Sequence, residues 1–207
     1  MLDRLFRLSE GMEEPGELFV RVESLEWQRR DVHLALRPLD AYAQDRELGT
    51  WRVSCFNVTG LSVTQQGGEL RLLGEDCPAV RQFLDPLRDL TFTGRPKSLE
   101  ELAWNLFAAH RSVAGDWISF EKYLNPCLDV AALLTSGFGK LADGPEFIVV
   151  ELNRVLMDSG LQATLGAPHR VKFWEDGAWH DVVSPLCGIA FGESWIVASG
   201  FEETPLS

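Results

Sequence analysis

The spacing of apolar residues changes near the middle of the chain, and this change constrains the fold more than any other sequence feature. Before about residue 97, apolar and polar residues alternate, as in LFVRV (18–22) and VHLALRPL (32–39). Such alternation places successive side chains on opposite faces of a strand. From Ser98 to Val113, apolar residues recur every three or four positions, which is the spacing of one helix face. The sequence therefore predicts an α+β fold.

The first part is predicted to be an antiparallel β-meander. QRRD (28–31) provides a turn between the first two strands, and WRVSCFNV (51–58) and LSVT (61–64) follow. Gly67-Gly68 before ELRLL (69–73) predicts a second hairpin, because glycine adopts the positive φ of short turns. After a short helix (79–85) and a strand (90–94), Gly94 to Lys97 is the expected boundary. It divides the chain into a β-rich half, 1–97, and an α+β half, 98–207, which form either two domains or one compact domain.

Helices are predicted for the middle of the chain. Ser98 is an N-cap with Glu101 at the capping-box position, and Gly115 ends this helix. Its apolar face is predicted to hold Leu99, Leu102, Ala103, Leu106, Phe107, His110 and Val113. Further helices are expected at 117–124, 128–134 and 145–159.

The glycine-rich segment SGFGKLADGP (136–145) resembles two phosphate-binding motifs without fulfilling either. Asp143-Gly144-Pro145 interrupts the helix that a dinucleotide-binding loop requires, and Leu141 stands where a P-loop needs Ser or Thr. A loop between two helices is the favoured interpretation.

A third hairpin signal, Asp176-Gly177, lies near the C-terminus in RVKFWEDGAWHDVV (170–183). If these two residues form the turn, Trp174 faces Trp179, Lys172 faces Asp181 and Val171 faces Val182. One register thus produces an aromatic pair, an opposite-charge pair and a β-branched pair. A last strand or hairpin is expected in IAFGESWIVAS (189–199).

Charge restricts the class of partner. The net charge is −12, and residues 98–207 hold 6 Lys/Arg against 15 Asp/Glu, compared with 13 against 16 in residues 1–97. An acidic surface repels phosphate backbones, so we expect no nucleic-acid ligand and allow a basic protein partner. Seven Trp residues can anchor an interface.

The remaining composition favours a cytoplasmic location without a membrane span. Charged residues interrupt the N-terminal apolar run, and no segment reaches the length of a membrane helix. The four Cys residues lie far apart without a C-x-x-C motif, which indicates reduced thiols. No His or Cys residues have metal-ligand spacing, so neither a metal nor a cofactor is expected.

His110 is the one histidine expected on an apolar helix face, within the stretch HRSVAGDWISFEKYLN (110–125). As a general base it would need an orienting carboxylate, which Asp116 or Glu121 could supply. The favoured alternative is structural: His110 is buried and hydrogen-bonded, Asp116 caps a helix, and Trp117, Phe120 and Tyr123 pack inward.

The same stretch, with LLTSGFGKLADGP (133–145) and FLDPLRDLTFTGRP (83–96), resembles an uncharacterised family of bacterial proteins of similar size. The resemblance covers the middle third of the chain and implies no activity, cofactor or catalytic residue.

These observations favour a cytoplasmic, non-enzymatic interaction protein, such as an immunity or regulatory subunit that binds a basic protein through its acidic C-terminal half. Trp117, Trp174 and Trp179 are the candidate binding residues. The alternatives are a small acid/base enzyme of the hydrolase or isomerase type, which would use His110 with Asp116 or Glu121, and a structural subunit of an assembly. The sequence predicts no oligomeric state.

Overall fold

The computed structural model describes residues 2–8, 18–40, 46–64, 67–126, 129–170, 172–182 and 185–206. It has the predicted α+β composition and divides into two compact units. Unit 1 comprises Met1–Val80 and Val183–Ser207, and unit 2 comprises Arg81–Val182. The division therefore does not fall at the expected boundary near residue 97, because the C-terminal strands pair with strands of the N-terminal segment.

Unit 1 is built on antiparallel strands. Its described strands are β1 (Phe19–Gln28), β2 (Asp31–Asp40), β3 (Arg46–Glu47), β4 (Thr50–Phe56), β5 (Gly60–Ser62), β6 (Gly68–Leu73), β12 (Cys187–Phe191), β13 (Ser194–Ala198) and β14 (Gly200–Leu206). Along the sheet their order is β14-β4-β2-β1-β6-β12-β13-β5, with β3 beside β2. The predicted first hairpin is confirmed as β1–β2.

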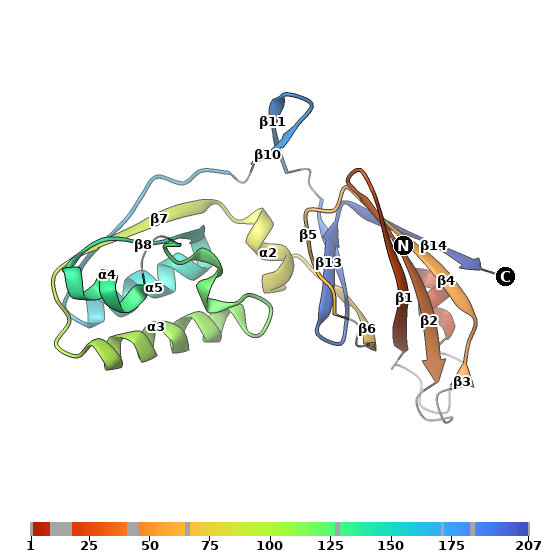
Figure 1. Cartoon of the computed structure of the whole chain (residues 1–207), viewed down its shortest axis with the longest axis horizontal. Coiled ribbons are helices and arrows are strands. Elements are labelled where there is room, and N and C mark those ends of the chain that lie inside the picture. Colours follow the sequence, from red (N-terminus) through yellow and green to blue (C-terminus); the bar gives the residue numbers. More distant parts are fainter. Residues whose placement is uncertain are drawn as a thin grey trace. The chain divides into compact units, whose positions relative to one another are not determined.

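The two ends of this strand order belong to one continuous ladder. Residues 50–62 form β4 and β5, residues 194–206 form β13 and β14, and the two segments run antiparallel along their length (Figure 1). The register shifts by one residue beside Asn57, whose φ of 50° marks a bulge. Thr59 N–H donates to Val197 O at 2.9 Å, and Ser199 N–H donates to Phe56 O at 2.9 Å, on either side of the shift. The strands consequently close into a ring.

The ring encloses an apolar core, and the N-terminal helix α1 (Asp3–Phe6) packs against this core. Leu5 is completely buried and Leu2 is 1% exposed, and both belong to this core. The carboxylate of Glu203 on β14 accepts hydrogen bonds from Arg4 N–H at 2.6 Å and Leu5 N–H at 2.7 Å. It thereby satisfies two N–H groups that a short helix leaves without partners.

Glu203→Ala should lower the free energy of unfolding by about 1–3 kcal/mol, because it leaves two amides of the N-terminal helix without their charged acceptor. Urea denaturation measures the change. Glu202→Ala, at the exposed neighbouring position on β14, is the matched control and should change stability by less than about 0.5 kcal/mol. Equal effects of the two substitutions would contradict the proposed role of Glu203.

The predicted second hairpin, between 61–64 and 69–73, is wrong. β5 pairs with β13, whereas β6 pairs with β1 and β12. Gly67 and Gly68 are needed for close packing and not for the expected turn. A Cβ on Gly67 would collide with Val20 O, and a Cβ on Gly68 would collide with the backbone of Gly192. The two glycines allow close approach of neighbouring strands.

Unit 2 combines helices with a smaller antiparallel sheet. The chain enters it through α2 (Pro78–Leu84) and continues as β7 (Leu87–Thr93), α3 (Leu99–Ala114), the 3-10 helix η2 (Phe120–Tyr123), α4 (Val130–Ser136), β8 (Phe138–Pro145), α5 (Glu146–Asp158), β9 (Gln162–Leu165), β10 (Lys172–Glu175) and β11 (Ala178–Asp181). The sheet order is β8-β7-β9. α5 packs against these strands, and α3 packs against α5 and α4 (Figure 1). α3 therefore lies on the far side of α5 from the sheet.

Two predicted features of unit 2 are confirmed. Ser98 is the N-cap of α3, and its Oγ accepts a hydrogen bond from Glu101 N–H at 3.2 Å. The Asp176-Gly177 hairpin has the predicted register, with Trp174 opposite Trp179 and Lys172 opposite Asp181. Both turn residues have positive φ, 49° and 80°, as a two-residue hairpin turn requires. The expected pair of Val171 and Val182 involves Val171, which lies outside the described residues.

The segment predicted as a helix-to-helix loop, 136–145, is instead mostly strand β8. It pairs with β7 from Leu87↔Pro145 to Thr93↔Phe138. Its glycines suit this sheet rather than a phosphate: Gly139 has a φ of 146°, and a Cβ on Gly144 would lie 2.8 Å from the side chain of Tyr123. The helix predicted at 117–124 is reduced to the single 3-10 turn η2.

No helix among the described residues is long and apolar enough to cross a membrane. Cys55, Cys77 and Cys187 are free thiols, and burial raises the pKa of Cys55 to about 12. Cys127 lies outside the described residues.

Candidate functional site

His110 lies inside the core of unit 2. It is 2% exposed and its ring meets Phe120 edge-on, with centroids 5.4 Å apart. The expected burial is thus observed, but the expected hydrogen bond is not found at Nε2, which is buried without a partner. His110 therefore belongs to the buried face of α3, where its ring packs against Phe120.

The two candidate carboxylates do not assemble with His110 into an acid/base set. Asp116 pairs with Arg111, and its side chain is 83% exposed. Glu121 is exposed on η2. Burial lowers the pKa of His110 below its ordinary value of 6.5, and this effect is larger than the opposing effect of the negative charge of Glu121, which raises the pKa.

The lowered pKa of His110 should make unit 2 less stable in mild acid. Below pH 6.5 the unfolded chain binds a proton that the buried imidazole does not, so the free energy of unfolding falls until the pH reaches the lowered pKa. Urea denaturation between about pH 7.5 and 5.5 should show a weaker pH dependence in His110→Gln than in the wild type. Parallel curves for the wild type and His110→Gln would show that His110 does not titrate differently in the folded protein.

The hairpin β10–β11 presents the two tryptophans that the sequence singled out. Trp174 and Trp179 are 59% and 64% exposed, and their rings form an edge-to-face pair with centroids 5.3 Å apart. An isolated two-stranded hairpin is marginally stable, and such a cross-strand aromatic pair stabilises it. The pair therefore rigidifies the hairpin while leaving most of both indoles accessible to a partner.

Trp117 has a different environment from this pair. Its side chain is partly buried and packs against the core of unit 2. Its backbone N–H, just after the end of α3, donates to Ala114 O at 3.2 Å. Its packing contributes to the core, and less of its surface is accessible than that of the hairpin tryptophans.

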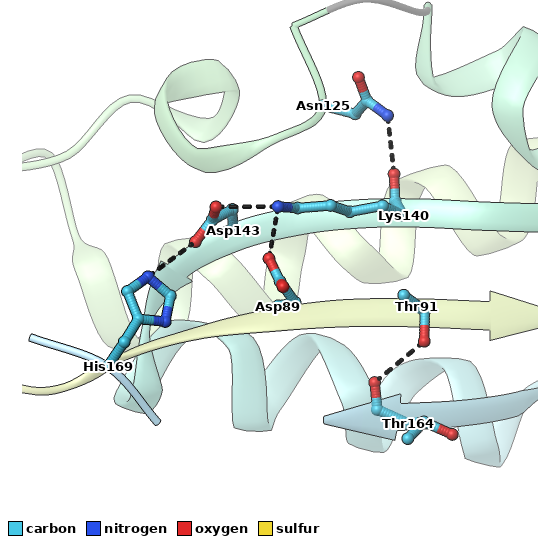
Figure 2. Close-up of polar contacts among 7 residues, drawn as sticks. All are labelled: Asp89, Thr91, Asn125, Lys140, Asp143, Thr164 and His169. Carbon is cyan, nitrogen blue, oxygen red and sulfur yellow. Dashed lines mark hydrogen bonds and ion pairs between the residues drawn. The ribbon is translucent and has the colours of Figure 1, made fainter. Parts of the chain in front are cut away.

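A polar cluster lies on the sheet β8-β7-β9, on strands that the sequence did not place together (Figure 2). Lys140 Nζ contacts the carboxylates of both Asp89 and Asp143, the latter at 2.9 Å. These hydrogen bonds raise the pKa of Lys140 and lower that of Asp89. His169 Nε2 lies 3.8 Å from Asp143 Oδ1. The raised pKa of Lys140 disfavours a role as a nucleophile. The contact of Lys140 on β8 with Asp89 links this strand to β7.

A groove of about 670 Å³ lies between α3 and α5. Its lining includes Glu101 and Asn105 from α3 and Arg154 and Asp158 from α5. Arg154 is already paired with Asp158 at 3.2 Å and with Glu151. His110 is not among the lining residues. Among the described residues no group of three His, Cys, Asp or Glu side chains has the arrangement of a metal site.

Comparisons with models of protein families, with curated proteins and with solved structures find no match to this chain. The resemblance to a bacterial family therefore remains a prediction.

Sequence reasoning did not identify the most exposed aromatic side chains of α3. Trp104 is 67% exposed, and Phe107, which was predicted on the buried face, is 39% exposed. The rotation of about 100° per residue along a helix predicts this exposure. It places Trp104 and Phe107 on the same side of α3 as the charged Glu100 and Arg111. Leu102 and Leu106 lie on the opposite side.

Proposed function

We propose that the protein is a non-enzymatic interaction module, such as an immunity or regulatory subunit, which binds a basic protein segment. The observation that carries the proposal is the exposed pair of Trp174 and Trp179 on the hairpin β10–β11. Indole faces attract Arg and Lys side chains, and exposed aromatic residues are enriched at protein interfaces.

The charge around the tryptophans supports a basic partner. The hairpin sequence from Lys172 to Asp181 contains Glu175, Asp176 and Asp181 against the single Lys172, which lies 3.9 Å from Asp181. The acidic residues of this hairpin sequence would attract cationic side chains and repel acidic ones. A segment that places arginines on the two rings is therefore the favoured ligand.

The acidity of the whole molecule supports the same sign of partner but not a single acidic half. Unit 2 contains 10 Lys/Arg and 14 Asp/Glu, whereas unit 1 contains 9 and 17. The excess of acidic over basic residues in 98–207 is thus divided between the two units. Long-range attraction would accelerate encounter with a basic partner, and the hairpin would supply the short-range contacts.

Binding should be tested with immobilised peptides of about 12 residues that alternate Arg and Leu, with a Glu/Leu peptide of equal length as the negative ligand. The Arg/Leu peptide should bind, and Trp174→Ala/Trp179→Ala should weaken the affinity by about tenfold or more, because two cation–π contacts are lost. Raising the salt concentration should weaken wild-type binding.

Trp27→Ala is the matched control, because Trp27 is 57% exposed on β1 and lies outside the β10–β11 hairpin. This variant should bind the Arg/Leu peptide with wild-type affinity. The proposal fails if the hairpin variant binds as tightly as the wild type, or if the Glu/Leu peptide binds equally well.

A further inference from the structure

The solvent-facing side of α3 carries a short stripe that the core does not use. Glu100, Trp104, Phe107 and Arg111 follow one another at intervals of four, three and four residues. At about 100° per residue these positions fall within an arc of about 60° on the helix. The stripe faces away from Leu102 and Leu106, which are each 1% exposed.

The two aromatic residues form one continuous apolar surface. The rings of Trp104 and Phe107 have centroids 5.9 Å apart, and Phe107 is supported from behind by the edge-on ring of Phe120 at 5.6 Å. The surface is consequently fixed in position, with the Trp104 side of it 67% exposed. α3 packs against α5, α4 and η2. Within the stripe, Phe107 contacts Phe120 of η2 and Arg111 pairs with Asp116, whereas most of the Trp104 side chain stays exposed.

The order of residues in the stripe is symmetric. The midpoint between Trp104 and Phe107 is also the midpoint between Glu100 and Arg111, so an aromatic pair is flanked at equal distances by opposite charges. A twofold axis through this midpoint would bring Trp104 of one copy against Phe107 of the other. The same operation would bring Glu100 of each copy against Arg111 of the other, as in a self-complementary twofold interface.

We propose that this stripe is a homodimer interface, in which the α3 helices of two copies pack antiparallel around that twofold axis. The interface uses none of the hairpin residues, so it extends beyond the proposed partner binding. Spacings of four and three residues are those at which two helices pack side by side along a seam.

Charge favours a second copy over other occupants. A basic segment would be attracted by Glu100 but repelled by Arg111, and an acidic segment would be attracted by Arg111 but repelled by Glu100. An antiparallel second copy instead places an opposite charge against each of the two residues. A parallel copy would set Glu100 against Glu100 and Arg111 against Arg111. Arg111 pairs within the chain with Asp116, but both side chains are exposed, at 52% and 83%, so the guanidinium can also reach a second carboxylate.

The expected dimer is of modest affinity. α3 has 16 residues and is about 24 Å long, so one helix pair buries less than the roughly 800 Å² per partner of a standard stable interface. Interfaces of this size are typical of weak or transient association, so we expect a dissociation constant on the order of micromolar.

Sedimentation velocity of the full chain, from about 1 to 200 μM, measures this equilibrium. Concentration-dependent dimerisation is expected for the wild type, and Trp104→Ala should raise the dissociation constant by about tenfold or more, as loss of a central aromatic anchor does. Trp27→Ala, at a tryptophan that is 57% exposed on β1, is the matched control and should dimerise like the wild type. Thermal melts establish that each variant is folded.

Charge reversal tests the antiparallel arrangement itself. Glu100→Arg and Arg111→Glu should each weaken dimerisation, because each places like charges opposite one another. The double reversal, Glu100→Arg with Arg111→Glu, should restore it to within about threefold of the wild type, because both cross-helix pairs are re-formed with opposite sign. A chain that stays monomeric up to 200 μM, a dimer that Trp104→Ala leaves unchanged, or a folded double reversal that remains monomeric would each overturn the proposal.

Discussion

The pairing of residues 50–62 with residues 194–206 is the constraint on which unit 1 depends. These segments are separated by more than a hundred residues of chain, yet their ladder closes the ring of strands around the core. Without it, β4 and β13 would each expose an edge of unpaired N–H and C=O groups. The bulge beside Asn57 lets one ladder bend while remaining hydrogen-bonded on either side. The attachment of α1 through Glu203 also depends on it, because β14 supplies that carboxylate.

The same pairing makes unit 2 an insertion between two parts of unit 1. Arg81–Val182 have their own core, in which Leu90 and Phe92 of β7 pack with Leu102, Leu106 and the apolar face of α5. Both surfaces proposed to bind other molecules belong to this inserted unit. One is a hairpin whose tryptophans stabilise it without being covered, and the other is the outward side of a helix whose inward side is already buried. The hairpin is stabilised by the tryptophan pair itself, whereas α3 is held by the packing of its buried face.

The sequence predicted best what local interactions decide. The Asp176-Gly177 turn requires positive φ at two successive positions, and its register then follows from the alternation of side chains. Ser98 likewise needs only the N–H of Glu101, three residues away, to begin α3. The Trp174–Trp179 surface could therefore be predicted, since both its position and its pairing are local.

Features that depend on distant partners could not be predicted in the same way. β8 forms because β7 lies beside it, and the glycines of 136–145 resemble a loop when that neighbour is unknown. Gly67 and Gly68 are required by the closeness of Val20 and Gly192, which no local pattern reveals. His110 lay on the expected face, but the absence of a partner for Nε2 is set by which groups surround it. The Lys140 cluster needed the register of β7 against β8.

Native-state hydrogen exchange tests the closure of the ring most directly. If the ladder between residues 50–62 and 194–206 closes the unit, the hydrogen-bonded amides of β4 and β14 should exchange through one common opening, with the same free energy and the same denaturant dependence as those of β1 and β2. Amides of β14 that exchange at nearly unprotected rates, while those of β1 and β2 remain protected, would contradict this account of the fold.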